Sequence, residues 1–174
     1  MAIGIIDIAG FMGMASFVAA YQAKSVRGTN LLFIPGDFSY CAHFFFLGAP
    51  GLAAIAGIAG IRDIVMTSTK RHLLSYTIYV YPLLIWILTW FTAEQAFELL
   101  GCVASTLCVI GMSLHGRFLS SRLILLVHQS IWITTAIIAG SWPLLLHNSL
   151  TMVSSIITML RYVRATQPCC DSIS

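Results

Sequence analysis

An acid and an imidazole each lie deep inside an apolar stretch of this sequence. Asp37 follows Pro35-Gly36 within the stretch 30–47, and His128 lies within the stretch 123–140. A proline interrupts helical hydrogen bonding, and an ionisable group beside such a break is typical of an ion or substrate site. A carboxylate and an imidazole that face each other could also share a proton. The alternatives are a structural acid paired with a neighbouring donor, and a histidine hydrogen-bonded to the backbone.

Further polar side chains follow one helical face of the last apolar stretch. Asn148, Thr151, Ser155 and Thr158 recur at spacings of three, four and three residues. Inside lipid such a face turns inward, either to pack or to line a cavity. Trp132, one turn after His128, could form the floor of a pocket, although membrane tryptophans also have structural roles. The predicted substrate-binding residues are Asp37, His128, Trp132, Asn148 and Ser155.

Four more charged residues lie near the predicted ends of helices. We predict that Arg62 and Asp63 form a gating ion pair; the alternative is that Arg62 extends to the water interface. Asp7 and Glu98 each lie in the first turn of a predicted helix, where an acid complements the helix dipole at the outer surface. His43 is predicted to be a buried packing residue rather than a metal ligand.

Motifs for enzyme chemistry are missing from the sequence. The chain contains no HExxH, no CxxC and no glycine-rich phosphate loop. No nucleophile stands beside a base in any recognisable pattern. We therefore predict a protein that is not an enzyme and that holds no metal and no cofactor.

The composition of the chain indicates that the segments that position these residues lie in lipid rather than in water. Of the 174 residues, 59% are hydrophobic and 9% are charged, whereas soluble domains carry roughly 25% charged residues. Such a chain cannot cover a water-facing surface, so we predict an integral membrane protein whose main partner is the lipid bilayer. The net charge of +3 is too small to indicate a nucleic-acid partner.

Seven apolar stretches are long enough to cross the hydrocarbon core, which needs ~17–25 helical residues. The spans are predicted at Ile3–Tyr21, Asn30–Leu47, Gly51–Thr67, Leu73–Phe91, Ala96–Leu114, Leu123–Gly140 and Pro143–Val163. Tight turns rich in Gly and Pro, at 48–51 and 140–143, separate the closest pairs of spans.

The basic residues predict the orientation of these spans. With seven crossings all of them fall on one face: Lys24, Arg27, Arg62, Lys70, Arg71, Arg117, Arg122, Arg161 and Arg164. The positive-inside rule assigns that face to the cytoplasm. The N-terminus is therefore predicted outside and the C-terminus in the cytoplasm.

A weak internal repeat runs through the chain. A shift of 91 residues aligns several pairs, among them Asp7 with Glu98, Gly10 with Gly101, and Asp37 with His128. We predict an all-α membrane protein in which two parallel three-helix repeats are joined by a linker helix (3+1+3). Within this single membrane domain, repeat one covers 1–71, the linker helix 72–93, repeat two 94–165 and a cytoplasmic tail 166–174. The plan is similar to that of SWEET-type sugar transporters and PnuC-type vitamin transporters.

The third span is dense in small residues, which allow two helices to approach closely. Ala53 and Gly57, and then Gly60, have the spacing of such a packing face. We expect this face to pack within the first three spans. A homo-oligomer formed through the same three residues is the alternative.

Short motifs at the ends of both halves resemble one family. These are His43-Phe44-Phe45-Phe46-Leu47-Gly48 with Gly60-Ile61-Arg62, and Trp132 with Ala139-Gly140-Ser141 and Arg161-Tyr162. From about Ile6 to Arg164, the chain resembles the YgjV family of bacterial inner-membrane proteins. The resemblance implies a multi-pass protein of the bacterial cytoplasmic membrane and no particular activity.

These features lead to two hypotheses about function. The first is a transporter for a small polar solute, with a site at the middle of the membrane between the two halves. The second is a membrane component that does not transport, such as a partner subunit or a sensor. The ionisable residues in the second and sixth spans favour the first hypothesis.

Overall fold

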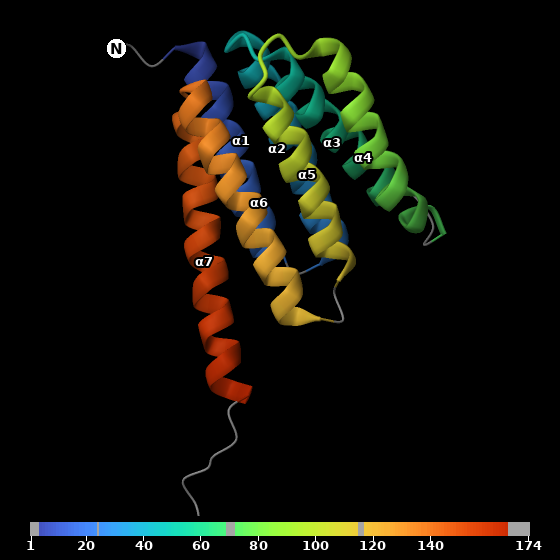
Figure 1. The fold of residues 1–174 in the computed structure, drawn as a ribbon, viewed down its shortest axis with the longest axis vertical. Coiled ribbons are helices and arrows are strands. Elements are labelled where there is room, and N and C mark those ends of the chain that lie inside the picture. Colours follow the sequence, from blue (N-terminus) through green and yellow to red (C-terminus); the bar gives the residue numbers. More distant parts are fainter. Residues whose placement is uncertain (1–3, 24, 69–71, 115–116, 167–174) are drawn as a thin grey trace, which may run out of the picture.

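The computed structural model describes residues 4–23, 25–68, 72–114 and 117–166, and within these ranges the chain forms seven α-helices (Figure 1). The helices are α1 (Ile5–Gln22), α2 (Val26–Phe46), α3 (Pro50–Ser68), α4 (His72–Thr92), α5 (Glu98–Ser113), α6 (Phe118–Ala139) and α7 (Trp142–Thr166). The number and order agree with the predicted spans. Three of the basic residues, Lys24, Lys70 and Arg71, and the tail from 167 onward lie outside the described residues.

Helix α2 begins at Val26, one turn before the predicted start at Asn30. Ser25 caps it, because its side chain accepts a hydrogen bond from the backbone N–H of Gly28 at 3.1 Å. Pro35 lies inside the helix, which continues through it. In the preceding turn, the Ser16 hydroxyl of α1 donates to the carbonyl of Leu32 at 2.7 Å. A side chain of the bundle thus satisfies backbone next to the proline, as lipid could not.

The two predicted tight turns have left-handed glycines. Gly48 has φ of 78° and Gly140 has φ of 69°, a conformation that other L-residues rarely adopt. Each glycine follows the end of a helix, α2 or α6, and lets the chain reverse within a few residues. The following helices α3 and α7 therefore run back alongside α2 and α6.

Six of the helices form a closed ring, and α4 lies outside it. Helices α1, α2 and α3 pack in order, as do α5, α6 and α7. Contacts of α1 with α7 and of α3 with α5 join the two groups. Helix α4 packs against α3 and α5 at the edge of the bundle (Figure 1).

The outer helix α4 has one buried face. Tyr81, Ile85 and Thr89, spaced four residues apart, are all buried. The side chains that point away, such as Trp90 and Phe91, are 72% and 80% exposed. An exposed face of this apolar character suits lipid rather than water.

The small residues of α3 pack inside the chain. A methyl group on Gly60 would come within 3.0 Å of the Phe38 ring of α2, and one on Gly57 within 3.4 Å of the Cys41 sulfur. Ala53 is buried as well. This face is therefore used by α2 of the same chain, and a homo-oligomer through these three residues has no support.

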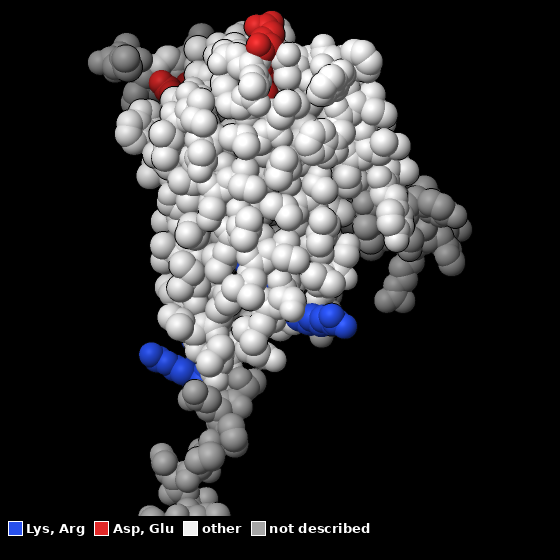
Figure 2. Space-filling view, in the orientation of Figure 1, with Lys and Arg blue, Asp and Glu red and all other residues white. Residues whose placement is uncertain are grey.

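The surface is apolar between two charged ends. On the face seen in Figure 2, acidic side chains gather at the end where α1 begins and basic ones where α7 ends. We call these the acidic end and the basic end; α1, α3, α5 and α7 run from the first to the second. Among the described residues, three helices are long and apolar enough to cross a membrane, at Pro50–Thr67, Phe118–Ala139 and Trp142–Arg164. Two shorter apolar helical stretches are Tyr79–Thr92 and Glu98–Ser113.

Candidate functional site

A cavity of about 670 Å³ lies inside the helix ring. Every one of the seven helices contributes to its lining, although α4 contributes only Tyr81. All seven residues predicted for the binding site and the gate line this one cavity: Asp37, Arg62, Asp63, His128, Trp132, Asn148 and Ser155. The structure thus brings them together, while their role in binding stays a prediction.

The two ends of the cavity differ. Toward the acidic end its lining finishes with Phe44, Trp132 and Leu144. Beyond them lies a packed layer in which His43 and Ser141 are at most 2% exposed. Toward the basic end the lining includes exposed side chains, such as Tyr21 and Met112. The cavity lining therefore ends with buried and half-buried residues toward the acidic end and includes exposed residues toward the basic end.

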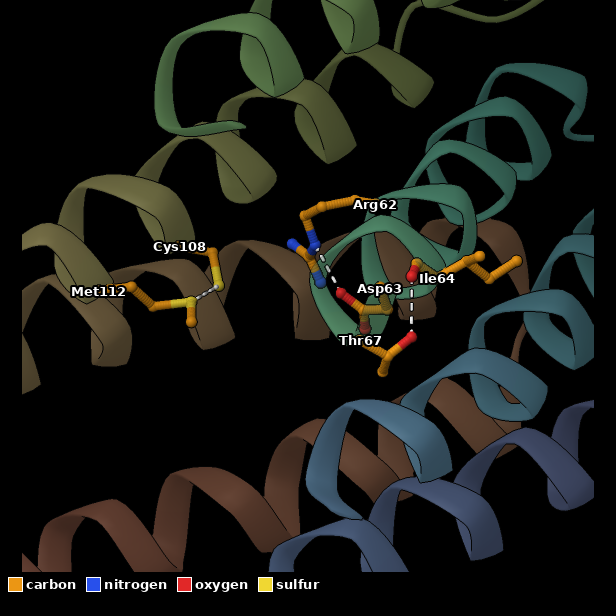
Figure 3. Close-up of polar contacts among 6 residues, drawn as sticks. All are labelled: Arg62, Asp63, Ile64, Thr67, Cys108 and Met112. Carbon is orange, nitrogen blue, oxygen red and sulfur yellow. Dashed lines mark hydrogen bonds and ion pairs between the residues drawn. The ribbon is translucent and has the colours of Figure 1, made fainter. Parts of the chain in front are cut away.

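The charged groups of the cavity sit mainly on α2 and α3. Arg62 Nε donates to Asp63 Oδ1 at 2.7 Å, as Figure 3 shows. The guanidinium carbon of Arg62 also lies 4.7 Å from the centre of the Tyr81 ring, a cation–π contact. Asp37, on α2, interacts electrostatically with both Asp63 and Arg62. Arg62 is 20% exposed, so it is held within the bundle rather than extended to water.

Three lining oxygens are buried without a hydrogen-bond donor. They are Oδ2 of Asp37, Oδ2 of Asp63 and Oε1 of Gln129. The three residues are 7%, 1% and 5% exposed. With both carboxyl groups ionised all three atoms are acceptors, and a buried polar atom without a partner is costly; the carboxyl groups of Asp37 and Asp63 also lie close to each other. A bound solute that donates hydrogen bonds could therefore satisfy these three oxygens.

His128 does not pair with Asp37. Its Nδ1 lies 2.7 Å from the backbone carbonyl of Ala104, and a carbonyl only accepts, so Nδ1 carries a proton that it donates there. Among the described residues no hydrogen bond joins His128 to Asp37. The structure therefore does not show a proton shared between them: His128 donates to α5, and one oxygen of Asp37 has no hydrogen-bond partner.

The other predicted residues sit on α6 and α7. Trp132 lies edge-on to His128, with ring centroids 6.5 Å apart. Asn148 donates through Nδ2 to the carbonyl of Leu144 at 2.9 Å. Ser155 accepts from Gln129 Nε2 at 3.4 Å, which links α7 to α6. The polar face of α7 thus serves both packing and the cavity.

The sequence analysis does not predict an aromatic wall of the cavity, which Phe17, Tyr40 and His147 form. Tyr40 stacks on His147 with ring centroids 5.9 Å apart and an interplanar angle of 12°. The Tyr40 hydroxyl lies 3.2 Å from His147 Nδ1 and hydrogen-bonds to it. Phe17 packs against the same imidazole at 4.8 Å. Spacing offers the missed signal, because Tyr40 follows Asp37 by one turn and His147 precedes Thr151 by one turn.

The buried side chain of His43 links three segments at the acidic end. His43 donates through Nδ1 to the Ile6 carbonyl at 2.7 Å, and its Nε2 lies 2.8 Å from the Ser141 hydroxyl. His43 is thus the satisfied packing residue that its sequence context predicts, and it joins α1, α2 and the start of α7.

Glu98 differs from its prediction. It lies in the first turn of α5 but is completely buried instead of lying at the outer surface. One carboxylate oxygen accepts from the backbone of Gly51 at 2.5 Å and of Leu52 at 3.3 Å, in the first turn of α3. The other accepts from Glu94 and Gln95, each at 2.9 Å. Asp7 makes the single expected contact in its own first turn, with Gly4 N–H at 3.4 Å.

Among the described residues, no group of three or more His, Cys, Asp or Glu side chains could hold a metal ion. The cavity instead combines acceptor oxygens, imidazoles and aromatic rings. These are groups that bind a solute by hydrogen bonds, charge and stacking.

Comparison with protein-family models gives a match to Imp-YgjV, described as bacterial inner membrane protein, over residues 4–166. The chain belongs to the Imp-YgjV family. The match spans all seven helices, and the resemblance to this family that the sequence motifs indicate is confirmed. No curated protein and no solved structure matches the chain. As an Imp-YgjV protein it is a protein of the bacterial inner membrane, which agrees with its apolar surface between two charged ends.

Proposed function

We propose that this Imp-YgjV protein is a transporter that carries a small polar solute through its helix ring, rather than an enzyme. The observation that supports this most is the cavity of about 670 Å³, which lies between α1–α3 and α5–α7. Its volume is in the range of small-molecule sites, about 300–1,000 Å³. Its polar lining lies deep inside an otherwise apolar protein, which is typical of a solute pathway.

The proposal includes the 3+1+3 repeat, with α4 as the linker. Exchanging α1–α3 with α5–α7 leaves the pattern of contacts among these six helices unchanged, because the α1–α7 contact exchanges with the α3–α5 contact, while α4 contacts only α3 and α5. Two aligned glycines support this. A methyl group on Gly10 would come within 2.7 Å of Pro143 in α7, and one on Gly101 within 2.8 Å of Leu52 in α3. Equivalent glycines thus lie at equivalent helix crossings.

In this proposal all seven helices cross the membrane, with the N-terminus outside and the C-terminus in the cytoplasm. The basic end is then cytoplasmic. The cavity would open to the cytoplasm and be closed toward the outside by the layer around His43 and Ser141. Transport would require this layer to open while the basic end closes, as in alternating access.

The roles of individual residues follow from their positions. Asp37, His128, Trp132, Asn148 and Ser155 would contact the solute, because each lines the cavity. The Arg62–Asp63 pair lies toward the basic end of the same cavity, where rearrangement of the pair could gate access from the cytoplasm.

Uptake by purified protein in liposomes tests the proposal. A panel of labelled amines, amino acids, sugars and nucleosides should include a solute that wild type takes up and Asp37→Asn does not. Glu94→Gln is the matched control, since Glu94 is an exposed acid outside the cavity. Equal uptake by Asp37→Asn and wild type would remove Asp37 from the mechanism. Co-purification of a stoichiometric partner, with no uptake, would favour the partner subunit or sensor instead.

A further inference from the structure

We propose that the cavity binds a protonated organic amine, with its ammonium group between Asp37, Asp63 and Gln129 and its apolar body against the aromatic wall. This names the substrate class of the site described above, and it rests on the proposed transport function for the identity of that site. Hydrogen-bonding capacity, charge and the character of the walls support it separately.

The first argument is hydrogen bonding. The three buried oxygens without a partner, on Asp37, Asp63 and Gln129, all belong to lining residues and all accept. They come from α2, α3 and α6, so they surround part of the cavity rather than forming one surface strip. An ammonium group carries three N–H donors and no acceptor. It is therefore the compact group that could satisfy such a set.

The second argument is charge. Four lining residues carry formal charges: Asp37, Asp63, Arg62 and Arg122. Arg62 pairs with Asp63, and Arg122 lies at the start of α6 with its guanidinium 5.3 Å from the Phe118 ring. Asp37 has no ion pair of its own. Asp37 and Asp63 thus share the single nearby charge of Arg62, which leaves one buried carboxylate in excess, so a cationic solute would be stabilised there.

The third argument is the character of the walls. Beside the aromatic wall, which includes Phe17 and Tyr40, further aromatic rings line the cavity, among them Phe44, Tyr81 and Trp132. Aromatic faces attract cations and also take apolar groups. One of these rings already receives a cation, because Arg62 lies over Tyr81 at 4.7 Å. An amine with an apolar body would use both properties.

Other solute classes fit less well. A neutral polyol offers donors, but it leaves the Asp37 carboxylate without an opposite charge. An anionic solute would bring a further negative charge close to two carboxylates and no donor. The charge of the solute is therefore the property to vary in a test.

Binding to purified protein in detergent tests the inference without any need for transport. The probe is radiolabelled phenethylammonium, measured by scintillation proximity. Unlabelled phenethylamine, 2-phenylethanol and phenylacetate compete; they share a phenyl ring and differ in charge at neutral pH. We expect saturable binding that the amine displaces at least tenfold better than either competitor. Displacement by the alcohol or the acid as strong as by the amine, or no saturable binding of the amine, would overturn the inference.

Variants give a second readout. Asp37→Asn should lower the affinity for phenethylammonium about tenfold or more, and Glu94→Gln should leave it unchanged. Size-exclusion profiles identify a variant that fails to fold, and the comparison of the three competitors on wild type does not depend on any variant. Binding of the amine without uptake into liposomes would overturn the transport proposal and keep this one. Uptake of a neutral solute by a protein that does not bind the amine would keep the transport proposal and overturn the inference of an amine site.

Discussion

Glu98 provides the sharpest test of how the acidic end is held together. Its buried carboxylate accepts four backbone hydrogen bonds, two from the start of α3 and two from the segment before α5. In Glu98→Gln the amide keeps one oxygen, which can serve only one of the two pairs. The NH₂ group then faces two N–H donors, so the other pair loses its acceptor.

The magnitude follows from the number of bonds lost. A hydrogen bond to a charged group contributes about 1.5–3 kcal/mol, so two lost bonds should cost about 3 kcal/mol or more. For a chain of this size, 1 kcal/mol corresponds to about 2–4 °C in Tm, which gives a decrease of about 6–12 °C. Asp7 is the matched comparison, because it aligns with Glu98 in the proposed repeat but makes one contact at 3.4 Å. Asp7→Asn should cost less than about 0.5 kcal/mol, as do most surface substitutions.

Thermal unfolding of both variants in the same detergent measures this difference. Wild type, Glu98→Gln and Asp7→Asn should be purified and followed side by side, with size exclusion before heating to exclude aggregated material. The reasoning would be refuted by equal shifts in Tm for the two variants. A Glu98→Gln protein as stable as wild type would mean that the carboxylate does not hold α3 to α5.

Three further predictions concern the closed end and the cavity. In Gly10→Ala the new methyl group would come within 2.7 Å of Pro143 and 2.9 Å of His43, so unfolding in detergent should show a loss of about 1–3 kcal/mol; an unchanged Tm would contradict this crossing. In a chain whose other cysteines are replaced by serine, a membrane-impermeant thiol reagent should label Cys108, which lines the cavity, in inverted vesicles but not in spheroplasts. The opposite pattern would reverse the proposed orientation. Ser141→Ala removes the hydroxyl that hydrogen-bonds to His43, so it should increase Cys108 labelling in spheroplasts; no increase would show that other contacts keep this end closed.

The sequence predicts the number of helices well, because apolar runs are interrupted by short polar or glycine-rich segments. Boundaries are less predictable. The expected start of α2 at Asn30 came from the thickness of the hydrocarbon, whereas Ser25 starts the helix through its own hydrogen bond. Hydrophobicity shows where lipid can cover a helix, but not how far a capped helix extends beyond the lipid.

The candidate site is predictable where polar residues stand out against an apolar chain. Asp37 and Asn148 were identified because lipid excludes such groups. Tyr40 and Tyr81 were missed because aromatic residues are equally stable against lipid and in a protein interior. Residue type alone therefore does not show whether such a side chain faces lipid or the cavity. The structure does not show the possible pairing of Asp37 with His128, for a related reason. A helical position predicts which way a side chain points, but its hydrogen-bond partner depends on the neighbouring helix.

The hydrogen bonds of His43 have a consequence for motion. One side chain fastens three helices at the acidic end, and Glu98 fastens two more segments there. At the basic end, long helices such as α7 finish with side chains that are exposed. In this conformation the helices should therefore move least at the acidic end, and the amplitude of their motion should grow toward the basic end. Amide hydrogen exchange should be slow around His43 and become progressively faster toward the end of α7.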